Sequence, residues 1–528
     1  MSERPLGAQI SHMLRDRGVT HIFGIPGVHN QEMYRGIEEA GLTHILARHE
    51  QGAGFMADGY ARATGRPGVC YVITGPGLCN VMTPLGQAYS DSVPVLCISS
   101  CLDETAATKG QLHQMKDQRA AAETVCDWSE TALSAEAGYA LIDRALFEFE
   151  AKRPRSKHVS FPIKLLQADA PGPQTKTPVP SHDEMSPKIA TTLAEDLNAA
   201  RRPLFILGGG CVDDADQTLR DVIRRSGAAC FTTYAGRGVI DADAPLYFGS
   251  YLARPGSAEV AAQADLIIAV GTEMAEVDLW RDTLGHSAPM WRVDIDPGVL
   301  ARQTHPEDVA LNVSAASFFD ALDTKLTAQL NSDWTMAEVA ATRAKWRAQV
   351  MAERPGIVPV ADALREALPP KTMIYSDMTQ FAYAAKEVWD MDAPGHWHHP
   401  TGFGTLGYAL PASIGGAVAR PGKPTICIIG DYGFQYTMAE LATAVELKLP
   451  LPIVLWDNGK LGEIEDSMVR AQIAPNAVVQ QNPDFLKLAE AFGAYAAGPE
   501  SLTEFQKAVK IALAADRPTL IRITPELA

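Results

Sequence analysis

The segment from 424 to 460 constrains the fold of this chain most, because two short apolar runs flank a helical pattern within it. The runs 424–429 and 452–456 are rich in β-forming residues and sharply bounded, which predicts two buried strands. Thr437 is placed to cap a helix over 438–449 between them. A strand, a helix and a strand in this order predict a right-handed unit with parallel strands. The chain is therefore expected to belong to the α/β class.

Two oxygen-bearing side chains follow these strands. Asp431 comes directly after the first strand and Asn458 shortly after the second. Loops at the carboxyl ends of parallel strands meet at one edge of a sheet and bind ligands there. A carboxylate, an amide oxygen and a backbone carbonyl, placed at Lys460, suit Mg²⁺, which prefers hard oxygen ligands and often also binds phosphate. We therefore expect a metal-bound diphosphate at this edge. The alternative is an ordinary strand-to-helix turn without a ligand.

The same segment resembles the thiamin diphosphate fingerprint, in which Gly-Asp-Gly is followed at a fixed interval by Asn-Asn. The interval from Asp431 to Asn458 is 458 − 431 = 27 positions, which fits that pattern. Two residues depart from it: Tyr432 replaces the second Gly, although Gly433 follows, and Asp457 replaces the first Asn. The resemblance implies that Asp431, Tyr432, Gly433 and Asn458 bind the coenzyme, with altered packing of the loop.

Length and composition exclude several classes of protein. A chain of 528 residues suggests about three domains. Its net charge of −17 disfavours nucleic acids and anionic membranes as partners, and no apolar run is long enough to span a bilayer. The first 18 residues favour an amphipathic helix over a signal sequence, and the eight Cys lie mostly in apolar runs. We therefore expect a cytoplasmic protein with reduced thiols.

Alternating helical and strand patterns predict three α/β domains. The first is expected at 1–168 and ends at a Pro-rich linker over 169–188. A Rossmann-like middle domain is expected at 189–333, because Gly-rich turns end two of its strands. A linker helix over 334–356 then leads to the third domain at 357–528.

Glu50 lies where a predicted strand over 45–50 meets a predicted helix over 51–64. An acid at such a junction is most often one that the helix dipole favours. The stretches 48–53, 57–62 and 74–80, however, resemble the pyrimidine-binding domain of the acetolactate synthase and 2-oxo-acid decarboxylase superfamily. The resemblance gives Glu50 the position of that family's catalytic Glu, whose carboxylate bonds N1′ of the aminopyrimidine and favours the imino tautomer. It also implies a pyrimidine-binding and a diphosphate-binding fold on either side of the middle domain.

The resemblance assigns roles to further residues of the first domain. His113 and Gln114 fall where relatives carry His or Gln side chains over the thiazolium ring, and they are expected to orient the substrate or shuttle protons. For His113, a solvated loop position is the alternative. Val28 stands where many simple decarboxylases carry an acid, so any proton relay must be built differently.

In the third domain, Thr379 and Gln380 follow a predicted strand over 373–376 and are expected near the diphosphate. The resemblance implies that Gly404 presents its carbonyl to the 4′-amino group. It further implies that Leu406 wedges between the two coenzyme rings and holds the bent conformation that brings the 4′ nitrogen to C2.

The middle domain lacks one feature of its flavin-binding relatives. In flavin-binding acetolactate synthases, an Arg-containing loop of this domain holds FAD, whereas the loop 273–278 contains no Arg. We therefore do not expect FAD and treat this domain as mainly structural, with a vestigial or regulatory nucleotide site left open.

The type of reaction depends on residues after the second Asn. Acetolactate synthases carry a Met five positions and a Trp nine positions after it, where this chain has Glu463 and Ser467. The stretches 23–34, 48–99 and 401–463 resemble the 2-ketoarginine decarboxylases most. That resemblance implies loss of carbon dioxide from a cationic 2-oxo acid and release of an aldehyde. Glu463 is expected to pair with the guanidinium tail or to assist protonation, and an acid that favours a helix start is the alternative.

Two other functions stay open from the sequence. One is a carboligase or lyase of the acetolactate synthase type, and the other is a coenzyme-binding paralogue in which Tyr432 and Asp457 have impaired catalysis. The resemblance also implies at least a homodimer, commonly a homotetramer, in which Glu50 and the diphosphate loop meet across a subunit interface. The expected partners are therefore a small 2-oxo acid and other copies of the chain, with no nucleic acid and no membrane.

Overall fold

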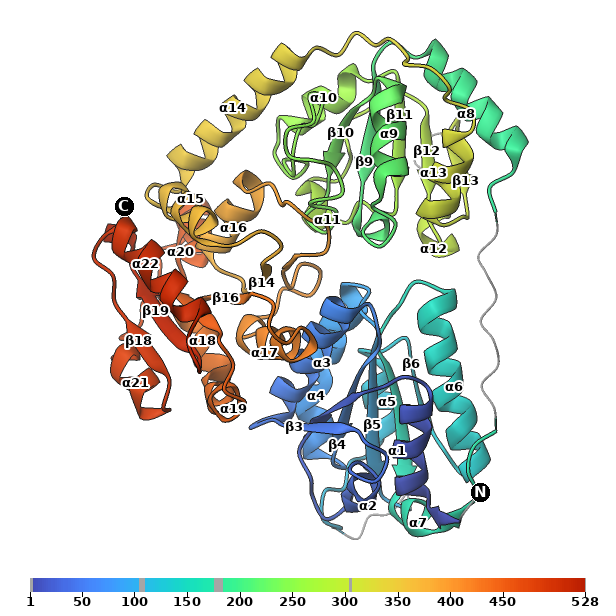
Figure 1. The fold of residues 1–528 in the computed structure, drawn as a ribbon, viewed down its shortest axis with the longest axis vertical. Helices are drawn as coiled ribbons and strands as arrows, with labels where there is room; N and C mark the ends of the chain where they lie inside the picture. Colours follow the sequence, from blue (N-terminus) through green and yellow to red (C-terminus); the bar gives the residue numbers. More distant parts are fainter. Residues whose placement is uncertain (1–2, 104–109, 175–183, 303–305, 528) are drawn as a thin grey trace.

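The structure, a computed structural model, describes residues 3–103, 110–174, 184–302 and 306–527. Within these ranges the chain forms three sheets of five or six strands, in which all strand pairs are parallel. Figure 1 shows them as three bodies, with the first in blue to teal, the middle one in green to yellow and the third in orange to red. The expected α/β class is confirmed. In the described ranges no helix combines the length and the apolar character needed to cross a bilayer.

The first sheet has the strand order β3-β2-β4-β5-β7-β6. Its central strands β4 and β5 are buried along their whole length, as expected of parallel strands covered on both faces. The strands are β2 (His21–Gly24), β3 (Thr43–Leu46), β4 (Gly68–Val72), β5 (Val95–Cys101), β6 (Trp128–Thr131) and β7 (Lys157–Pro162). The helices include α1 (Leu6–Asp16), α2 (Gln31–Arg35), α3 (Glu50–Thr64), α4 (Pro76–Ser90), α5 (Gln118–Glu123), α6 (Ala135–Ala151) and α7 (Ile163–Gln167).

The junction before α3 differs from the prediction. Strand β3 already ends at Leu46, and Glu50 is the first residue of the helix instead of the last residue of a strand. The N–H groups of Arg48 and His49 each donate to Glu440 Oε1 at 3.0 Å. The chain leaves the sheet early because these two donors are paired with a side chain of the third domain.

The middle sheet has the order β10-β9-β11-β12-β13. The strands are β9 (Pro203–Leu207), β10 (Ala229–Thr232), β11 (Leu266–Val270), β12 (Met290–Val293) and β13 (Val309–Leu311), and the main helices are α8 (Pro187–Ala199), α9 (Gln217–Ser226), α10 (Ser257–Gln263) and α13 (Ala315–Asp323). A Cβ at Gly208 would lie 2.1 Å from the carbonyl oxygen of Gly271. This glycine therefore lets the ends of β9 and β11 pack closely.

Two connections join the middle sheet to the others. Residues 175–183 of the expected linker lie outside the described residues, and β8 (Asp169–Ala170) at its start pairs with β1 (Arg4–Pro5) of the first domain. On the other side, α14 (Met336–Glu353) begins after the N-cap Thr335 and runs from the middle body to the third (Figure 1).

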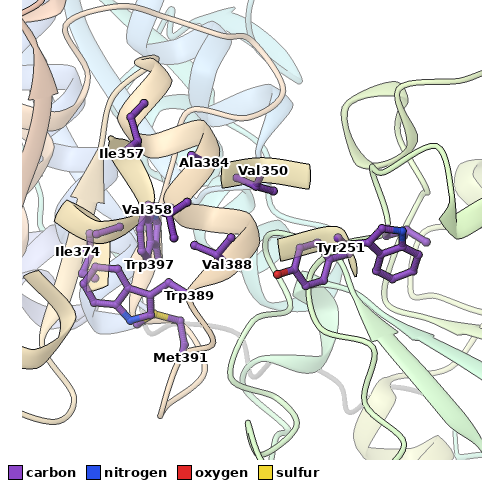
Figure 2. Packing of buried hydrophobic residues seen from close by; sticks show 14 of the residues in the cluster. Tyr251, Val350, Ile357, Val358, Ile374, Ala384, Val388, Trp389, Met391 and Trp397 are labelled. Atoms are coloured by element: carbon purple, nitrogen blue, oxygen red, sulfur yellow. The ribbon is translucent and has the colours of Figure 1, made fainter. Parts of the chain in front are cut away.

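Tyr251 and Val350 belong to the same buried apolar cluster as Trp389 and Trp397 of the third domain (Figure 2). The middle and third domains thus share a core.

The third sheet has the order β15-β14-β16-β17-β19-β18. Its strands are β14 (Met373–Ser376), β15 (Trp397–His398), β16 (Thr425–Gly430), β17 (Pro452–Trp456), β18 (Tyr495–Ala497) and β19 (Thr519–Ile523). Its helices include α15 (Ile357–Ala367), α16 (Gln380–Val388), α17 (Ala409–Ala419), α18 (Asp431–Thr437), α19 (Leu441–Glu446), α20 (Gly462–Arg470), α21 (Phe485–Ala491) and α22 (Leu502–Leu513).

The helix between β16 and β17 was predicted wrongly. Helix α18 starts at Asp431, directly after the strand, and a 3₁₀ turn over Met438–Glu440 separates it from α19. Thr437 ends α18 instead of capping a later helix, and its hydroxyl donates to the carbonyl of Gly407 at 2.9 Å. Within α18, a Cβ at Gly433 would lie 3.0 Å from the carboxylate carbon of Asp377, so the helix packs closely against this side chain.

The first and third domains of the chain pack together through α3 and α17 (Figure 1). A Cβ at Gly59 would lie 2.0 Å from the carbonyl oxygen of Ala412, and one at Gly415 would lie 2.0 Å from that of Met56. The two helix backbones are therefore in direct contact, which the small residues at these positions allow.

Candidate active site

Asp431 is the centre of a polar cluster at the carboxyl edge of the third sheet. Its side chain is buried, and Oδ2 accepts hydrogen bonds from Gly459 N at 2.8 Å and from Asn482 Nδ2 at 2.6 Å, while Oδ1 accepts from Tyr432 N at 2.8 Å. Burial raises the pKa of Asp431, and these donors act in the opposite direction. The loops after β16 and β17 thus converge on one carboxylate.

The turn after β17 places Asn458 and Lys460 beside this carboxylate. Gly459 adopts φ +67°, a left-handed conformation that favours glycine. Asn458 Oδ1 accepts a hydrogen bond from Lys460 N at 3.3 Å. Where Lys460 pairs with Val479 as in an antiparallel sheet, the backbone hydrogen bonds use the carbonyl of Gly459 and the N–H of Leu461. The carbonyl of Lys460 takes no part in this pairing. A carboxylate, an amide oxygen and a main-chain carbonyl are donors that fit a hard divalent cation.

Asn482 belongs to this cluster but carries no sequence motif. Its amide donates to Asp431 Oδ2 at 2.6 Å and to Asp457 Oδ1 at 2.7 Å. It therefore joins the two acids that follow β16 and β17. Its position 51 residues after Asp431, in a segment without regular structure, gave no signal in the sequence.

The departure at Asp457 has a partner in the structure. Parallel pairing of β17 with β19 places Leu455 opposite Arg522, and Arg522 Nε donates to Asp457 Oδ2 at 2.6 Å. Asp457 is buried and also accepts from Asn482, so both of its oxygens are hydrogen-bonded and Arg522 compensates its charge. The acid at position 457 therefore takes part in the hydrogen bonds that hold this loop.

Removing Arg522 tests that pairing. Arg522→Ala is expected to lower the free energy of unfolding by about 1–2 kcal/mol, because it leaves a buried carboxylate without its cation, although Arg522 itself is partly exposed. Urea unfolding measures the change. Adding Asp457→Asn to Arg522→Ala should recover most of the loss, since the amide keeps the bond to Asn482 without a charge. A double variant as unstable as the sum of the single ones would contradict this pairing.

The other expected coenzyme residues of the third domain border the same edge. Thr379 is buried at the N-cap of α16, and a Cβ at Gly430 would lie 3.3 Å from its hydroxyl oxygen. Gln380 Nε2 donates to Asp466 Oδ2 at 2.9 Å. Gly404 has φ +69° and donates its N–H to the Pro400 carbonyl at 3.1 Å.

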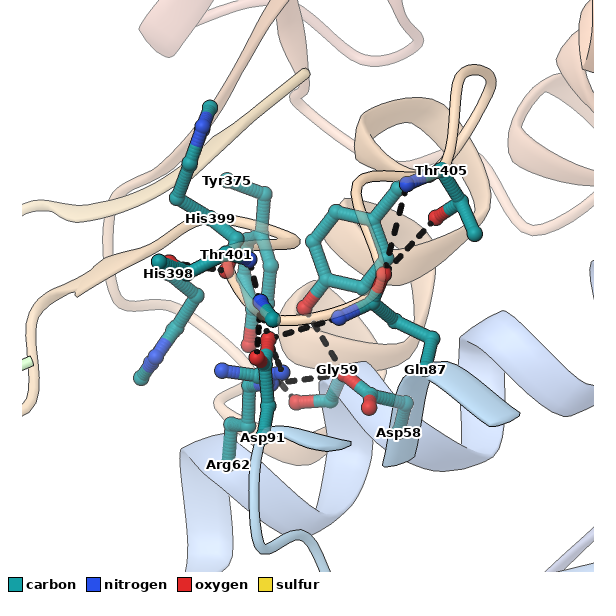
Figure 3. Close-up of polar contacts among 12 residues, drawn as sticks. Asp58, Gly59, Arg62, Gln87, Asp91, Tyr375, His398, His399, Thr401 and Thr405 are labelled. Atoms are coloured by element: carbon teal, nitrogen blue, oxygen red, sulfur yellow. Dashed lines mark hydrogen bonds and ion pairs between the residues drawn. The ribbon is translucent and has the colours of Figure 1, made fainter. Parts of the chain in front are cut away.

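Leu406 follows in the same loop and is half-buried. The first domain of the same chain anchors this loop, as Figure 3 shows. Asp91 Oδ1 accepts from Gly402 N at 2.7 Å, and Gln87 Oε1 accepts from the Thr405 hydroxyl at 3.0 Å. Asp91 is itself paired with Arg62. The polypeptide that carries Gly404 and Leu406 is therefore fixed from both domains.

Glu50 lies at the carboxyl edge of the first sheet, at the head of α3. Its Oε2 accepts a hydrogen bond from Asn80 Nδ2 at 2.9 Å. A Cβ at Gly77 would lie 3.4 Å from its Oε1. Gly75 begins the turn into α4 with φ +69°, and a Cβ there would lie 2.3 Å from the carbonyl oxygen of His113. The turn at 75–77 thus borders both Glu50 and His113.

His113 has a neighbour that the sequence did not single out. Its ring centroid lies 4.8 Å from that of His29, and the two rings are nearly perpendicular. Among the described residues, neither buried Nδ1 atom has a hydrogen-bond partner. Burial and the nearby His113 lower the pKa of His29. Gln114, by contrast, uses its side-chain oxygen to accept from Gln111 N at 3.0 Å within its own loop.

Glu50 and Asp431 belong to separate clusters in the single chain. One lies at the edge of the first sheet and the other at the edge of the third. Among the described residues, no hydrogen bond or ion pair joins the partners of Glu50 to those of Asp431. The two halves of the expected site therefore do not meet through direct polar contacts in one copy.

Comparison with known proteins identifies the family. Residues 4–121 match the N-terminal TPP binding domain of thiamine pyrophosphate enzymes, residues 190–322 match their central domain, and residues 377–523 match their C-terminal TPP binding domain. The chain belongs to the thiamine pyrophosphate enzyme family. The expected resemblance and the expected pair of coenzyme-binding folds around a middle domain are confirmed. Thiamine pyrophosphate is another name for thiamin diphosphate, so the expected coenzyme is that of the family.

Relatives in this thiamine pyrophosphate enzyme family match nearly the whole chain. A probable 2-ketoarginine decarboxylase of Pseudomonas aeruginosa, AruI, is 42% identical over 98% of this chain and 93% of its own length. The acetolactate synthase isozyme 2 large subunit of Escherichia coli is 30% identical over 98% of this chain and 95% of its own. The acetolactate synthase large subunit IlvB1 of Mycobacterium tuberculosis is 30% identical over 92% and 82%.

Glu463 in this thiamine pyrophosphate enzyme is already paired within the chain. Its Oε2 accepts from Arg354 Nη2 at 2.9 Å, and Arg470 lies 3.8 Å from its Oε1. The guanidinium of Arg354 also lies over the ring of Tyr383, 5.8 Å from its centroid. The carboxylate therefore already pairs with a guanidinium of the chain itself, and a substrate guanidinium would have to share it with Arg354.

Proposed function

We propose that this protein uses thiamin diphosphate to decarboxylate a 2-oxo acid with a polar or cationic tail, giving an aldehyde and carbon dioxide. The observation that carries the proposal is the carboxylate of Glu50, held by Asn80 at the head of α3 in a coenzyme-binding domain. The higher identity to a probable 2-ketoarginine decarboxylase, 42% against 30% for two acetolactate synthases, supports this reaction over carboligation.

The third domain is proposed to hold the diphosphate through Mg²⁺. Asp431, Asn458 and the Lys460 carbonyl offer a set of hard oxygen donors. Tyr432 and Gly433 follow Asp431 in the first turn of α18 and are proposed to border the diphosphate. Thr379 and Gln380 begin α16 at the same edge of the sheet.

The chain's own residues are proposed to position and protonate the reacting groups. Thiamin diphosphate, when bound, supplies the electron sink for loss of carbon dioxide. Asn80 engages Glu50 Oε2, so Glu50 Oε1 is available to hold a proton at N1′ of the pyrimidine. Gly404 and Leu406 would hold the pyrimidine ring. His113, with His29 beside it, would orient the substrate carbonyl and deliver a proton to the product carbon.

We propose that two subunits share each site, as a homodimer that also forms a homotetramer. Two observations support this. Glu50 and Asp431 lie in separate clusters of one chain, and large apolar side chains are exposed beside both. Val28 and Leu112, next to the His pair, are 62% and 61% exposed, and Phe403 and Tyr436, near the coenzyme loops, are 50% and 54% exposed. These apolar side chains are available to pack against a second copy of the chain beside the site. The eight unpaired cysteines support a reducing compartment such as the cytoplasm.

The test is release of carbon dioxide from a panel of 2-oxo acids, with and without thiamin diphosphate and Mg²⁺. Coenzyme-dependent release with one aldehyde per carbon dioxide is the expected result, greatest for acids with a guanidinium or amine tail. A condensed 2-hydroxy-ketone or acetolactate-type product would show carboligation instead. Binding of the coenzyme without any release would show an impaired paralogue.

Recognition of the cationic tail is assigned to Glu463. Glu463→Gln is expected to lower kcat/KM about tenfold more for the guanidinium substrate than for a neutral 2-oxo acid of similar length, because a charge-assisted hydrogen bond is worth roughly 1.5 kcal/mol more than a neutral one. Steady-state kinetics on both substrates measure the difference. Glu465→Gln removes the same charge on the same helix and should change both substrates equally. An equal loss on both substrates in Glu463→Gln would remove the recognition role.

A further inference from the structure

Glu440 is a buried carboxylate of the third domain that binds the backbone of the first. It is 1% exposed. Its Oε1 accepts from the N–H groups of Arg48 and His49 at 3.0 Å each, and its Oε2 accepts from Arg48 N at 3.2 Å. These donors lie two residues and one residue before Glu50. A side chain from the far end of the chain thus pairs the N–H groups that lead into α3.

The surrounding packing leaves little freedom to this contact. A Cβ at Gly52 would lie 2.1 Å from Glu440 Oε1, so the carboxylate rests directly on the first turn of α3. The hydroxyl of Thr443 lies 2.9 Å from Glu440 Oε2 and 3.3 Å from the carbonyl oxygen of Leu46. Figure 1 shows α19 beside the end of β3, where these contacts occur. The segment 440–443 therefore holds the chain on both sides of Glu50.

The position of Glu50 depends on this backbone. Residues 47–49 connect a strand that ends at Leu46 to a helix that begins at Glu50. N–H groups at such a junction need acceptors from outside the helix and the strand. A buried carboxylate that accepts hydrogen bonds from two of these N–H groups fixes the residue at which the helix begins. It also fixes the direction in which the first side chain of the helix points.

We infer that Glu440 is a positioning residue for Glu50, which sets the Glu50 carboxylate against the coenzyme pyrimidine by fixing the backbone before it. The inference rests on the proposed role of Glu50. Glu440 lies 440 − 431 = 9 positions after Asp431. If two subunits share each site, the segment 431–440 of one chain reaches the diphosphate of one coenzyme and holds the acid that serves another.

Glu440→Gln in the full-length holoenzyme tests this inference. The amide has one acceptor oxygen in place of two, so the N–H groups of Arg48 and His49 lose part of their pairing. The rate of C2 proton exchange in bound thiamin diphosphate and kcat are expected to fall roughly 10- to 100-fold, as for a misplacement of about 1 Å. The KM for the 2-oxo acid and the coenzyme Kd should stay at their original values. In the coenzyme-free protein, the amide protons of Arg48 and His49 should exchange faster with solvent.

Two further variants separate positioning from stability. Gly52→Ala keeps the charge of Glu440 but pushes its carboxylate away, and it should slow C2 exchange as Glu440→Gln does. Glu446→Gln removes a charge near the same place, from a 58% exposed side chain that pairs with the side chain of Arg48. It is expected to leave C2 exchange and kcat unchanged.

Each outcome is decisive. Normal C2 exchange in Glu440→Gln overturns the inference, even if the two amides exchange faster. Coenzyme affinity and thermal stability that fall in proportion to C2 exchange also overturn it, because they show a structural role alone. Glu50→Gln tells the two proposals apart. If C2 exchange is normal in that variant, the proposed function fails. If it is slow there but normal in Glu440→Gln, only this inference fails.

Discussion

Replacing Glu50 with Gln is expected to lower kcat for carbon dioxide release by about 10²- to 10⁴-fold, the usual contribution of a group that moves a proton. The amide keeps the size of the side chain and an oxygen for the bond from Asn80. It cannot carry the charge that favours a protonated N1′, so the 4′-imino nitrogen would no longer form readily. Steady-state rates at saturating coenzyme and C2 proton exchange measure the loss.

Coenzyme binding should survive this change. The diphosphate is proposed to bind at Asp431, in another domain, so the Kd for thiamin diphosphate is expected to change little. Glu123→Gln serves as a matched control, because Glu123 lies in the same domain, half-exposed on α5 and paired with Arg119. A Glu50→Gln enzyme with the original kcat would contradict the role of Glu50.

Asp431→Ala is expected to abolish tight binding of thiamin diphosphate and Mg²⁺. In the parent protein, coenzyme at a hundredfold excess over its Kd should raise the free energy of unfolding by about 2.7 kcal/mol. That stabilisation should disappear in the variant, because Asp431 offers the carboxylate of the donor set and also orders Gly459 and Asn482. Chemical unfolding with and without coenzyme measures it.

Asp431→Asn refines this prediction. It keeps an oxygen for the N–H of Gly459, but it removes the oxygen that accepts from the N–H of Tyr432 and the charge that attracts the cation. Binding should therefore recover in part when Mg²⁺ is raised. An Asp431→Ala protein that the coenzyme stabilises as strongly as the parent would contradict the proposed metal site.

The strands were the most predictable part of the fold. β14 and β17 match the predicted ranges residue for residue, because short β-rich runs buried on both faces are sharply bounded in sequence. The helix after β16 was misplaced because Gly433 near its start resembles a turn.

The site was predictable only where its residues follow a local motif. Asp431 and Asn458 each follow a strand, so their place at the sheet edge could be inferred from sequence. Arg522 joins them through the register of β17 with β19, and Asn482 through a segment without regular structure. Glu440 contacts residues almost 400 positions earlier, with a separation of 392 to Arg48. Such contacts depend on tertiary packing and leave no trace in residue spacing.

Mixing two inactive variants tests most directly whether one coenzyme is held by an acid and a metal loop from different subunits. Glu50→Gln and Asp431→Ala chains are unfolded together and refolded as mixed oligomers, with each variant refolded alone as control. If sites are shared, each mixed dimer holds one intact site, and random pairing should restore about a quarter of the parent activity. If mixing restores no activity while mixed oligomers form, each chain builds its own site, and the account is contradicted.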